Sequence, residues 1–168
     1  MKVLEEYSVD DQIRTFEETG FIRADVIERI RKYIQLQCEN YNDLNGSIVY
    51  KTPISITDVK IDGNNLIVEF KTSDDKYFRR TFRGELWRIF FGLDYAIIRD
   101  HGWIGVLVRC PSCGKFGRLH KSNNERFSIY HKEGDREYTH SFGPTTMFYD
   151  ELKRIHDRVL ELRGCWRD

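Results

Sequence analysis

The chain has 168 residues, 40% of them apolar and 32% charged, with a formal net charge of zero. This length and apolar content exclude an intrinsically disordered chain and indicate one domain, or one domain with a small appended module. No apolar run approaches the ~20 residues that span a bilayer, and the first residues lack the apolar core of a signal peptide, so we expect a cytoplasmic protein with no membrane partner.

The first part of the chain is predicted to be helical. Residues 9–19 form a short helical pattern that ends at Gly20, a residue suited to the left-handed conformation that follows a helix. Apolar residues then recur at helical spacing from Val26 to about residue 40. Turn-forming residues interrupt the pattern there, and a short strand is predicted at 47–50.

Three antiparallel strands are predicted next, at 54–61, 66–72 and 77–82. The first two flank the sequence DGNN at 62–65, which is typical of a two-residue hairpin turn. Apolar and charged residues alternate along these strands, so the meander is predicted to have one apolar face and one polar face.

The later elements are predicted from shorter patterns. A helix at 84–91, with Leu86 among its inward residues, precedes strands at 95–98 and 103–108. A last amphipathic helix is predicted from a cap at Thr145 or Thr146 to about residue 162. Between them, three short strands are predicted at 116–120, 127–132 and 137–142.

The sequence CPSCGK at 110–115 places two cysteines in one tight turn. Two histidines follow, His131 and His140, and two thiolates with two imidazoles can complete a tetrahedral zinc shell. If residues 133–137 hold a hairpin turn, the two histidines lie directly opposite each other, with Cβ atoms ~5 Å apart. His120 is the chief substitute if either histidine is not a ligand.

This segment resembles small zinc-ribbon modules of archaeal and archaeal-virus proteins. Residues 110–119 read CPSCGKFGRL, a strand ends at His131, and residues 140–144 read HSFGP, so the resemblance covers about residues 108–144. It implies a partner of the nucleic-acid or polymerase type. The chain departs from two-knuckle ribbons, which have a second pair of cysteines at this spacing. The resemblance implies that a structural zinc is held by Cys110, Cys113, His131 and His140.

Charge is unevenly distributed along the chain. Residues 1–75 hold 9 Lys and Arg against 15 Asp and Glu, whereas residues 76–126 hold 11 against 4. Basic residues interleaved with aromatic ones suit a phosphate-binding surface, so we expect DNA or RNA as a partner. Alternatively, the acidic first part folds against the basic middle and neutralises its charge. The chain would then be a protein-interaction or regulatory factor. The candidate nucleic-acid contacts are Arg79, Arg80, Arg83, Arg88, Lys115, Arg118 and Lys121.

A second constellation resembles the core of PD-(D/E)xK nucleases. Around the turn at 63–64, Asp58 is predicted to face Glu69, and Lys71 lies two residues along on the same face. The resemblance implies that the two acids bind Mg²⁺ and that Lys71 positions a water molecule. Thr57 stands where the family has a proline. The alternative is an ordinary solvated strand face on which lysines neutralise the acids.

Together the patterns predict an α+β protein in three parts. N-terminal helices on an antiparallel β-meander occupy 1–107, a zinc-ribbon module occupies 108–144, and an amphipathic helix at 145–168 packs back on the core. The favoured function is a zinc-stabilised nucleic-acid-binding protein with no catalytic residues. A Mg²⁺-dependent nuclease using Asp58, Glu69 and Lys71 is the alternative.

Overall fold

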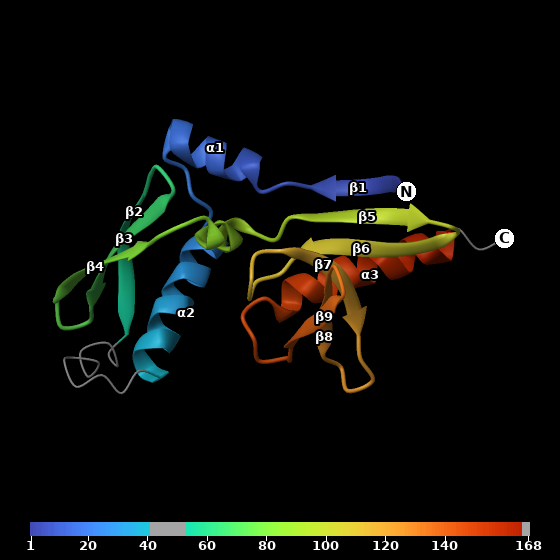
Figure 1. Cartoon of the computed structure of the whole chain (residues 1–168). Coiled ribbons are helices and arrows are strands. Elements are labelled where there is room, and N and C mark those ends of the chain that lie inside the picture. The colour runs from blue at the N-terminus through green and yellow to red at the C-terminus, as the bar shows by residue number, and fades with distance from the viewer. Residues whose placement is uncertain (41–52, 166–168) are drawn as a thin grey trace. The chain divides into compact units, whose positions relative to one another are not determined.

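The computed structural model describes the backbone of residues 1–40 and 53–165, and the strand predicted at 47–50 lies outside these residues. The described residues form three α-helices, one 3₁₀ helix and nine strands in two antiparallel sheets (Figure 1), which confirms the predicted α+β class. The chain divides into two compact units, one formed by Met1–Val9 with Leu93–Asp168 and the other by Asp10–Gly92. The domain divisions predicted after residues 107 and 144 both fall within Leu93–Asp168 and stay predictions.

We call the unit formed by Asp10–Gly92 the inserted unit, because it interrupts the sequence of the other unit. It combines helices with a three-stranded meander. Val26, Ile30 and Ile34 of its second helix are fully buried, as their spacing predicts, and that helix packs on the strand Ile54–Asp62 and on the 3₁₀ helix Leu86–Phe91. The first helix ends at Gly20, whose φ is 74° and whose N–H donates to the Phe16 carbonyl. The elements are α1 (Asp10–Thr19), α2 (Ala24–Asn40), β2 (Ile54–Asp62), β3 (Asn65–Thr72), β4 (Tyr77–Phe82) and η2 (Leu86–Phe91).

The meander has the predicted register at its first hairpin. Asp62 pairs with Asn65 across a two-residue turn, and Gly63 at the first turn position has a φ of 59°. Asp58 therefore lies directly opposite Glu69, and a bulge follows between Ile56 and Asp58. Alternate residues of β3 are buried, which confirms the predicted apolar face.

The helix predicted at 84–91 is instead the six-residue 3₁₀ helix η2. Leu86, predicted to point inward, is 45% exposed, whereas Trp87 and Phe90 are buried. Phe90 lies 5.4 Å from Tyr33 of α2, measured between ring centroids, and Trp87 Nε1–H donates to the Asn64 carbonyl. These contacts hold Trp87 and Phe90, three residues apart, on the same side of the 3₁₀ helix.

The second unit, which we call the six-stranded unit, is one antiparallel sheet with a helix against it. Its N-terminal strand is not predicted from the sequence, because that strand pairs with the strand Tyr95–Asp100, which comes only after the whole inserted unit. The strand order is β1 (Lys2–Tyr7), β5 (Tyr95–Asp100), β6 (Trp103–Arg109), β7 (Phe116–Lys121), β8 (Phe127–Glu133) and β9 (Arg136–Phe142).

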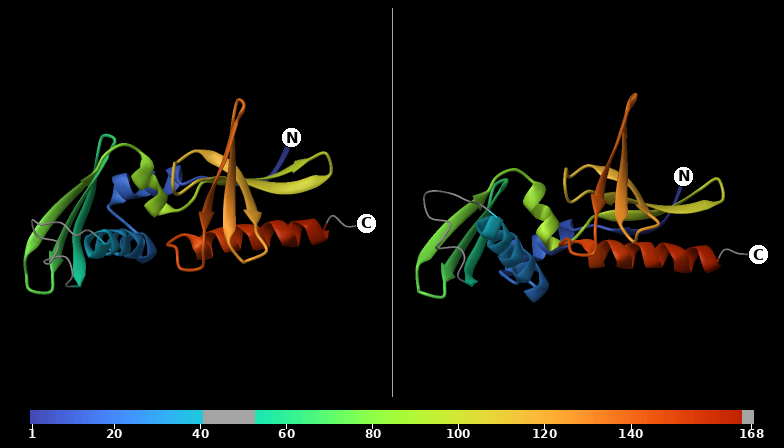
Figure 2. Two further views of the ribbon diagram at one scale, coloured as in Figure 1. Left: turned by 60° about the horizontal axis from the view of Figure 1, so that its bottom comes forward. Right: turned by 90° about the horizontal axis from the view of Figure 1, so that it is seen from below.

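Helix α3 (Tyr149–Cys165) packs on β6, β7 and β8, and the tip of the β8–β9 hairpin projects away from it (Figure 2). The helix begins later than predicted, because Thr146 Oγ1–H donates to the Gly143 carbonyl in a turn before the helix. Of the predicted apolar stripe Phe148, Leu152, Ile155, Val159 and Leu162, the first four residues are buried and Leu162 is partly exposed. No helix within the described residues has the length and apolar character needed to cross a membrane.

Candidate metal centre

The two cysteines lie in the turn that joins β6 to β7. The Cys110 N–H donates to the Lys115 carbonyl at 2.9 Å, and the Gly114 N–H donates to the Cys110 carbonyl at 2.8 Å. Gly114 has a φ of 78°, a conformation that glycine adopts without steric cost. The turn thus fixes both thiols at one end of the hairpin, with Cys110 fully buried and Cys113 partly exposed.

The two histidines come from β8 and β9, but not in the predicted pairing. Glu133 pairs with Arg136, so the turn is Gly134-Asp135, and His131 faces Tyr138 instead of His140. The predicted direct opposition is therefore wrong by two residues. Gly134, with a φ of 58°, permits this tighter two-residue turn. A shift of two keeps both rings on one face of the sheet, with their centroids 5.3 Å apart.

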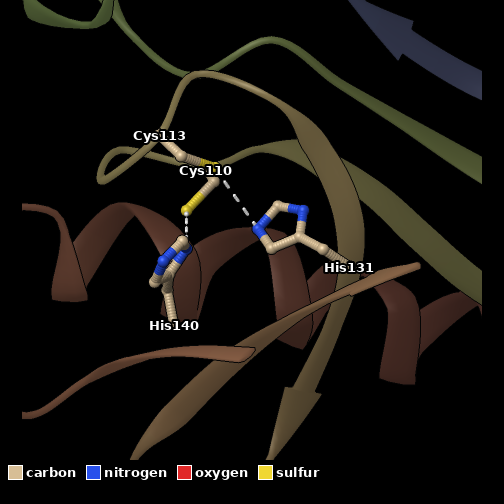
Figure 3. Close-up of side chains that lie close together, drawn as sticks. All are labelled: Cys110, Cys113, His131 and His140. Carbon is tan, nitrogen blue, oxygen red and sulfur yellow. Dashed lines mark hydrogen bonds between the residues drawn. The ribbon is translucent and has the colours of Figure 1, made fainter. Parts of the chain in front are cut away.

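The four side chains converge on one point (Figure 3). Cys110 Sγ lies 3.3 Å from His140 Nδ1, and Cys113 Sγ lies 3.6 Å from His131 Nε2. All four donor atoms lie within 4.8 Å of one another. Tetrahedral bonds of ~2.3 Å to sulfur and ~2.0 Å to nitrogen put neighbouring S and N atoms about 3.5 Å apart. The group can therefore hold a metal ion.

One ring nitrogen of His131 is already oriented by the backbone. Its Nδ1 lies 3.1 Å from the Phe116 carbonyl, which can only accept a hydrogen bond, so Nδ1 carries the proton. The other ring nitrogen, Nε2, lies toward Cys113 Sγ and is the one left to bind a metal ion. A histidine whose far nitrogen donates to a carbonyl is typical of metal ligands. The sequence alone does not identify Phe116 as this partner, because the β7–β8 pairing decides it.

The Cys110 thiol has an environment that disfavours its charged form. Burial raises its pKa to about 11, the nearby Cys113 sulfur adds to the rise, and backbone amides of the turn oppose it. At neutral pH a thiol in this environment stays protonated unless a cation stabilises the thiolate. A divalent ion between the four donors supplies that charge and is bound by the resulting thiolate.

His120, the substitute ligand considered from the sequence, lies outside this group. It is exposed on β7 and pairs with Ser128 of β8. Among the described residues, the two cysteines with His131 and His140 are the only group of three or more potential ligands close enough to share an ion.

The candidate nucleic-acid contacts are divided between the two units. Arg79 donates to Glu69 at 2.8 Å, Arg88 is paired with Asp10, and Lys115 is paired with Glu133. The first two pairs join the basic middle of the chain to its acidic first part, as the alternative interpretation of the charge pattern expects. Arg79, Arg80, Arg83 and Arg88 belong to the inserted unit, and Lys115, Arg118 and Lys121 belong to the six-stranded unit.

The candidate nuclease residues are brought together only in part. Asp58 lies opposite Glu69 in the register, but Glu69 accepts a hydrogen bond from Arg79, which lowers the pKa of the Glu69 carboxyl. Lys71 lies 3.9 Å from Asp75. A Mg²⁺ ion on the two acids would have to compete with the Arg79 guanidinium for Glu69.

Comparison of the chain with models of protein families, with curated proteins and with solved structures finds no match. The functional assignment therefore depends on the geometry of the chain's own residues.

Proposed function

We propose that this chain is a zinc-stabilised, cytoplasmic nucleic-acid-binding protein. The observation that carries the proposal is the convergence of two thiols and two imidazoles from three separate segments of the six-stranded unit. The donor set favours zinc, because thiolate and imidazole are the ligands of structural zinc sites. The knuckle between β6 and β7, with the other two ligands on β8 and β9, suits the zinc-ribbon module that the sequence suggests.

The zinc would be structural rather than catalytic. Four protein ligands fill a tetrahedral shell and leave no position for a water molecule or a substrate. Its effect would be to join the β6–β7 turn to β8 and β9, whose register is otherwise held by short ladders. Ligand binding to the folded state alone adds directly to the free energy of unfolding.

Nucleic acid is the proposed partner because of the charge and the aromatic residues of the basic middle segment. Residues 76–126 carry 11 Lys and Arg against 4 Asp and Glu. In the six-stranded unit, the Arg118 guanidinium lies 5.4 Å from the Trp103 ring centroid, and both residues are exposed. A cation and an aromatic ring therefore lie together on the surface. This combination suits phosphate contacts and base stacking.

Elemental analysis tests the metal half of the proposal. Protein purified without added chelator should contain about one zinc ion per chain, as a single four-ligand site requires. Cys110→Ser and His131→Gln should each lower that content strongly. His120→Gln changes an exposed histidine of the same sheet and should leave the zinc content unchanged. Equal metal content in all four proteins would contradict the ligand assignment.

Binding to DNA and RNA at several salt concentrations tests the other half. Phosphate contacts release counterions, so the logarithm of the affinity should fall linearly with the logarithm of the salt concentration. No measurable binding, or an affinity that ignores salt, would contradict the proposal. A protein partner that stays bound after nuclease treatment would instead favour a protein-interaction factor. The Arg79–Glu69 and Arg88–Asp10 pairs support that alternative, because they neutralise part of the basic middle segment.

The Mg²⁺-dependent nuclease stays a second candidate because Asp58 and Glu69 lie opposite each other. The protein would be incubated with linear and branched DNA in the presence of Mg²⁺ or Mn²⁺. Cleavage that disappears in Glu69→Gln but persists in Glu85→Gln, another acid of the same unit, would support it. Absence of cleavage, or equal cleavage by both variants, would end the idea.

A further inference from the structure

The face of the six-stranded sheet that points away from α3 carries a hollow with aromatic and cationic walls. Phe127 of β8 contacts Tyr149 and His156 of α3, so the alternate β8 residues Tyr130 and Lys132 point to the other face. We call this other face, over β6, β7 and β8, the open face. It has a hollow of about 470 Å³, lined among others by Leu107, Phe116, Arg118, Tyr130, Lys132 and Glu137.

The strand register sets these side chains in rows. Leu107 pairs with Arg118, and Arg118 pairs with Tyr130, so the three side chains cross the open face side by side. Phe116 lies at the next position of β7 on the same face and is 47% exposed. Glu137, beside Tyr130 in the lining of the hollow, raises the pKa of the tyrosine hydroxyl. Phe116 and Tyr130 are therefore held on neighbouring strands with part of each ring exposed, and the Arg109 guanidinium lies 4.7 Å from the Phe116 ring centroid.

Trp103 extends this surface along β6. A Cβ atom on Gly105 would lie 2.3 Å from the Trp103 ring, so the glycine allows the indole to lie flat along its own strand. The guanidinium groups of Arg118 and Arg163 each lie 5.4 Å from the centre of an indole ring system that stays 39% exposed. An exposed aromatic ring flanked by two cations is suited to stack a base beside a phosphate.

Three of the basic candidates outside the open face are neutralised by a carboxylate. Arg79, Arg88 and Lys115 each have a carboxylate partner. Among the described residues, neither Arg118 nor Lys132 is in an ion pair. The Arg163 guanidinium donates a hydrogen bond to the Ile104 carbonyl, which does not neutralise the arginine's charge. Glu137 is the one acid lining the hollow, so cations outnumber acids on this face.

We infer that the open face binds single-stranded nucleic acid, with bases stacked on Trp103, Phe116 and Tyr130 and with phosphates beside Arg118 and Lys132. This inference rests on the proposed function and names the surface that performs it. Single strands are favoured over duplexes because a duplex buries the base faces that the aromatic rings would contact. The surface is coupled to the metal centre through β7, because the Phe116 carbonyl accepts from His131 while its ring lies on the open face.

Fluorescence anisotropy of the full chain tests the inference with labelled single strands of about 20 nucleotides, longer than typical site sizes. DNA and RNA strands of one sequence, and the matching DNA duplex, serve as probes. Trp103→Leu and Tyr130→Leu should each weaken single-strand binding roughly 5- to 150-fold with an unchanged salt slope. Tyr130→Phe, which keeps the ring, should bind nearly as the parent does.

The cations give an independent readout. Arg118→Gln and Lys132→Gln should each reduce the salt slope by about 0.7, the value for one phosphate contact on a single strand. Lys153→Gln removes the same charge from an exposed position on α3 and should leave both affinity and slope unchanged. Zinc content and thermal melting of each variant would confirm that it is folded.

The outcomes separate this inference from the proposed function. If the parent protein binds none of the probes, both fail. If it binds but the open-face variants match the parent or Lys153→Gln, nucleic-acid binding stands and the assigned surface is wrong. Duplex binding as tight as single-strand binding, or displacement by polyglutamate as efficient as by the unlabelled strand, would overturn base stacking as the basis of recognition.

Discussion

Cys110 is the residue on which the candidate metal centre depends most directly. Its side chain is fully buried, and burial raises the pKa of its thiol to about 11. A proton must therefore leave this sulfur when a metal ion binds near neutral pH. The environment that makes the thiolate unfavourable in the metal-free protein also excludes water from the metal–sulfur bond.

Proton release gives the first prediction. Because at least one thiol proton is displaced, zinc affinity should rise about tenfold per pH unit between about pH 6 and pH 8, and more if further protons leave. Competition with a chromophoric chelator at several pH values, corrected for the chelator's own protonation, measures this. An affinity that stays constant across the range would argue that no thiol is a ligand.

Gly117 is a second residue that the candidate metal centre constrains, because β8 and its His131 approach this position closely. A Cβ atom at this position would lie 2.6 Å from the Tyr130 carbonyl oxygen and 2.9 Å from His131 Nδ1. Gly117→Ala should therefore displace the β7–β8 pairing, lower the free energy of unfolding by about 1–3 kcal/mol and weaken zinc binding. Urea denaturation and the chelator assay measure the two effects.

Gly164→Ala is the matched control for that change. Gly164 lies in α3, and a Cβ atom there would meet nothing within 4 Å. Because alanine is the better helix former, this variant should be as stable as the parent or gain up to about 1 kcal/mol. If both alanine variants behave alike, the close approach of Gly117 to the histidine strand is not a constraint.

At the scale of elements, helix α3 protects one face of the sheet that holds the ligands. His156 of α3 lies 5.5 Å from Phe127 between ring centroids, and burial, with a smaller contribution from Arg163, lowers its pKa below the ordinary 6.5. The unfolded chain therefore binds a proton more readily than the folded chain does. The neutral form stabilises the fold above about pH 6.5, and this contribution is lost as the pH falls through the lowered pKa.

His156→Phe keeps an aromatic ring on Phe127 and removes the titration. Its free energy of unfolding should decline less between about pH 7.5 and pH 5.5 than that of the parent, because the variant lacks this proton uptake. His120→Gln removes an exposed histidine that makes only a minor contribution to the lowered pKa of His156, and it should retain most of the parent's pH dependence. Denaturation curves at the two pH values decide this, and an unchanged decline in His156→Phe would contradict the burial argument.

The sequence predicts the elements well where one short pattern determines them. The knuckle and the DGNN turn carry their geometry in adjacent residues, so the paired thiols and the Asp58–Glu69 register follow from local rules. The β8–β9 register is predicted wrongly by two residues, since a glycine-containing stretch of five can close at more than one position. The histidines still converge because a shift of two returns each side chain to the same face.

At the scale of the whole molecule, the sequence misses what depends on distant pairing. The edge strand β1 pairs with β5 beyond the inserted unit, and no local pattern reports such a partner. The basic stretch at 76–126 is continuous in sequence but is divided between the two units, and several of its cations meet acids. The open face is also missed, because it combines alternate residues of three strands.

The two units should respond differently to loss of metal. Chelation should speed amide hydrogen exchange in the strands at 116–142, which the four ligands tie together, and leave the meander at 54–82 unchanged. Hydrogen exchange followed by mass spectrometry measures both segments in one sample. Equal acceleration in both segments would indicate that the ion stabilises the chain elsewhere.

X-ray absorption at the zinc edge of the purified 168-residue chain tests the central claim most directly. The account predicts a four-coordinate site with two sulfur neighbours at about 2.3 Å and two imidazole nitrogens at about 2.0 Å. A site surrounded by oxygen or nitrogen alone, or a protein that retains no zinc, would contradict it.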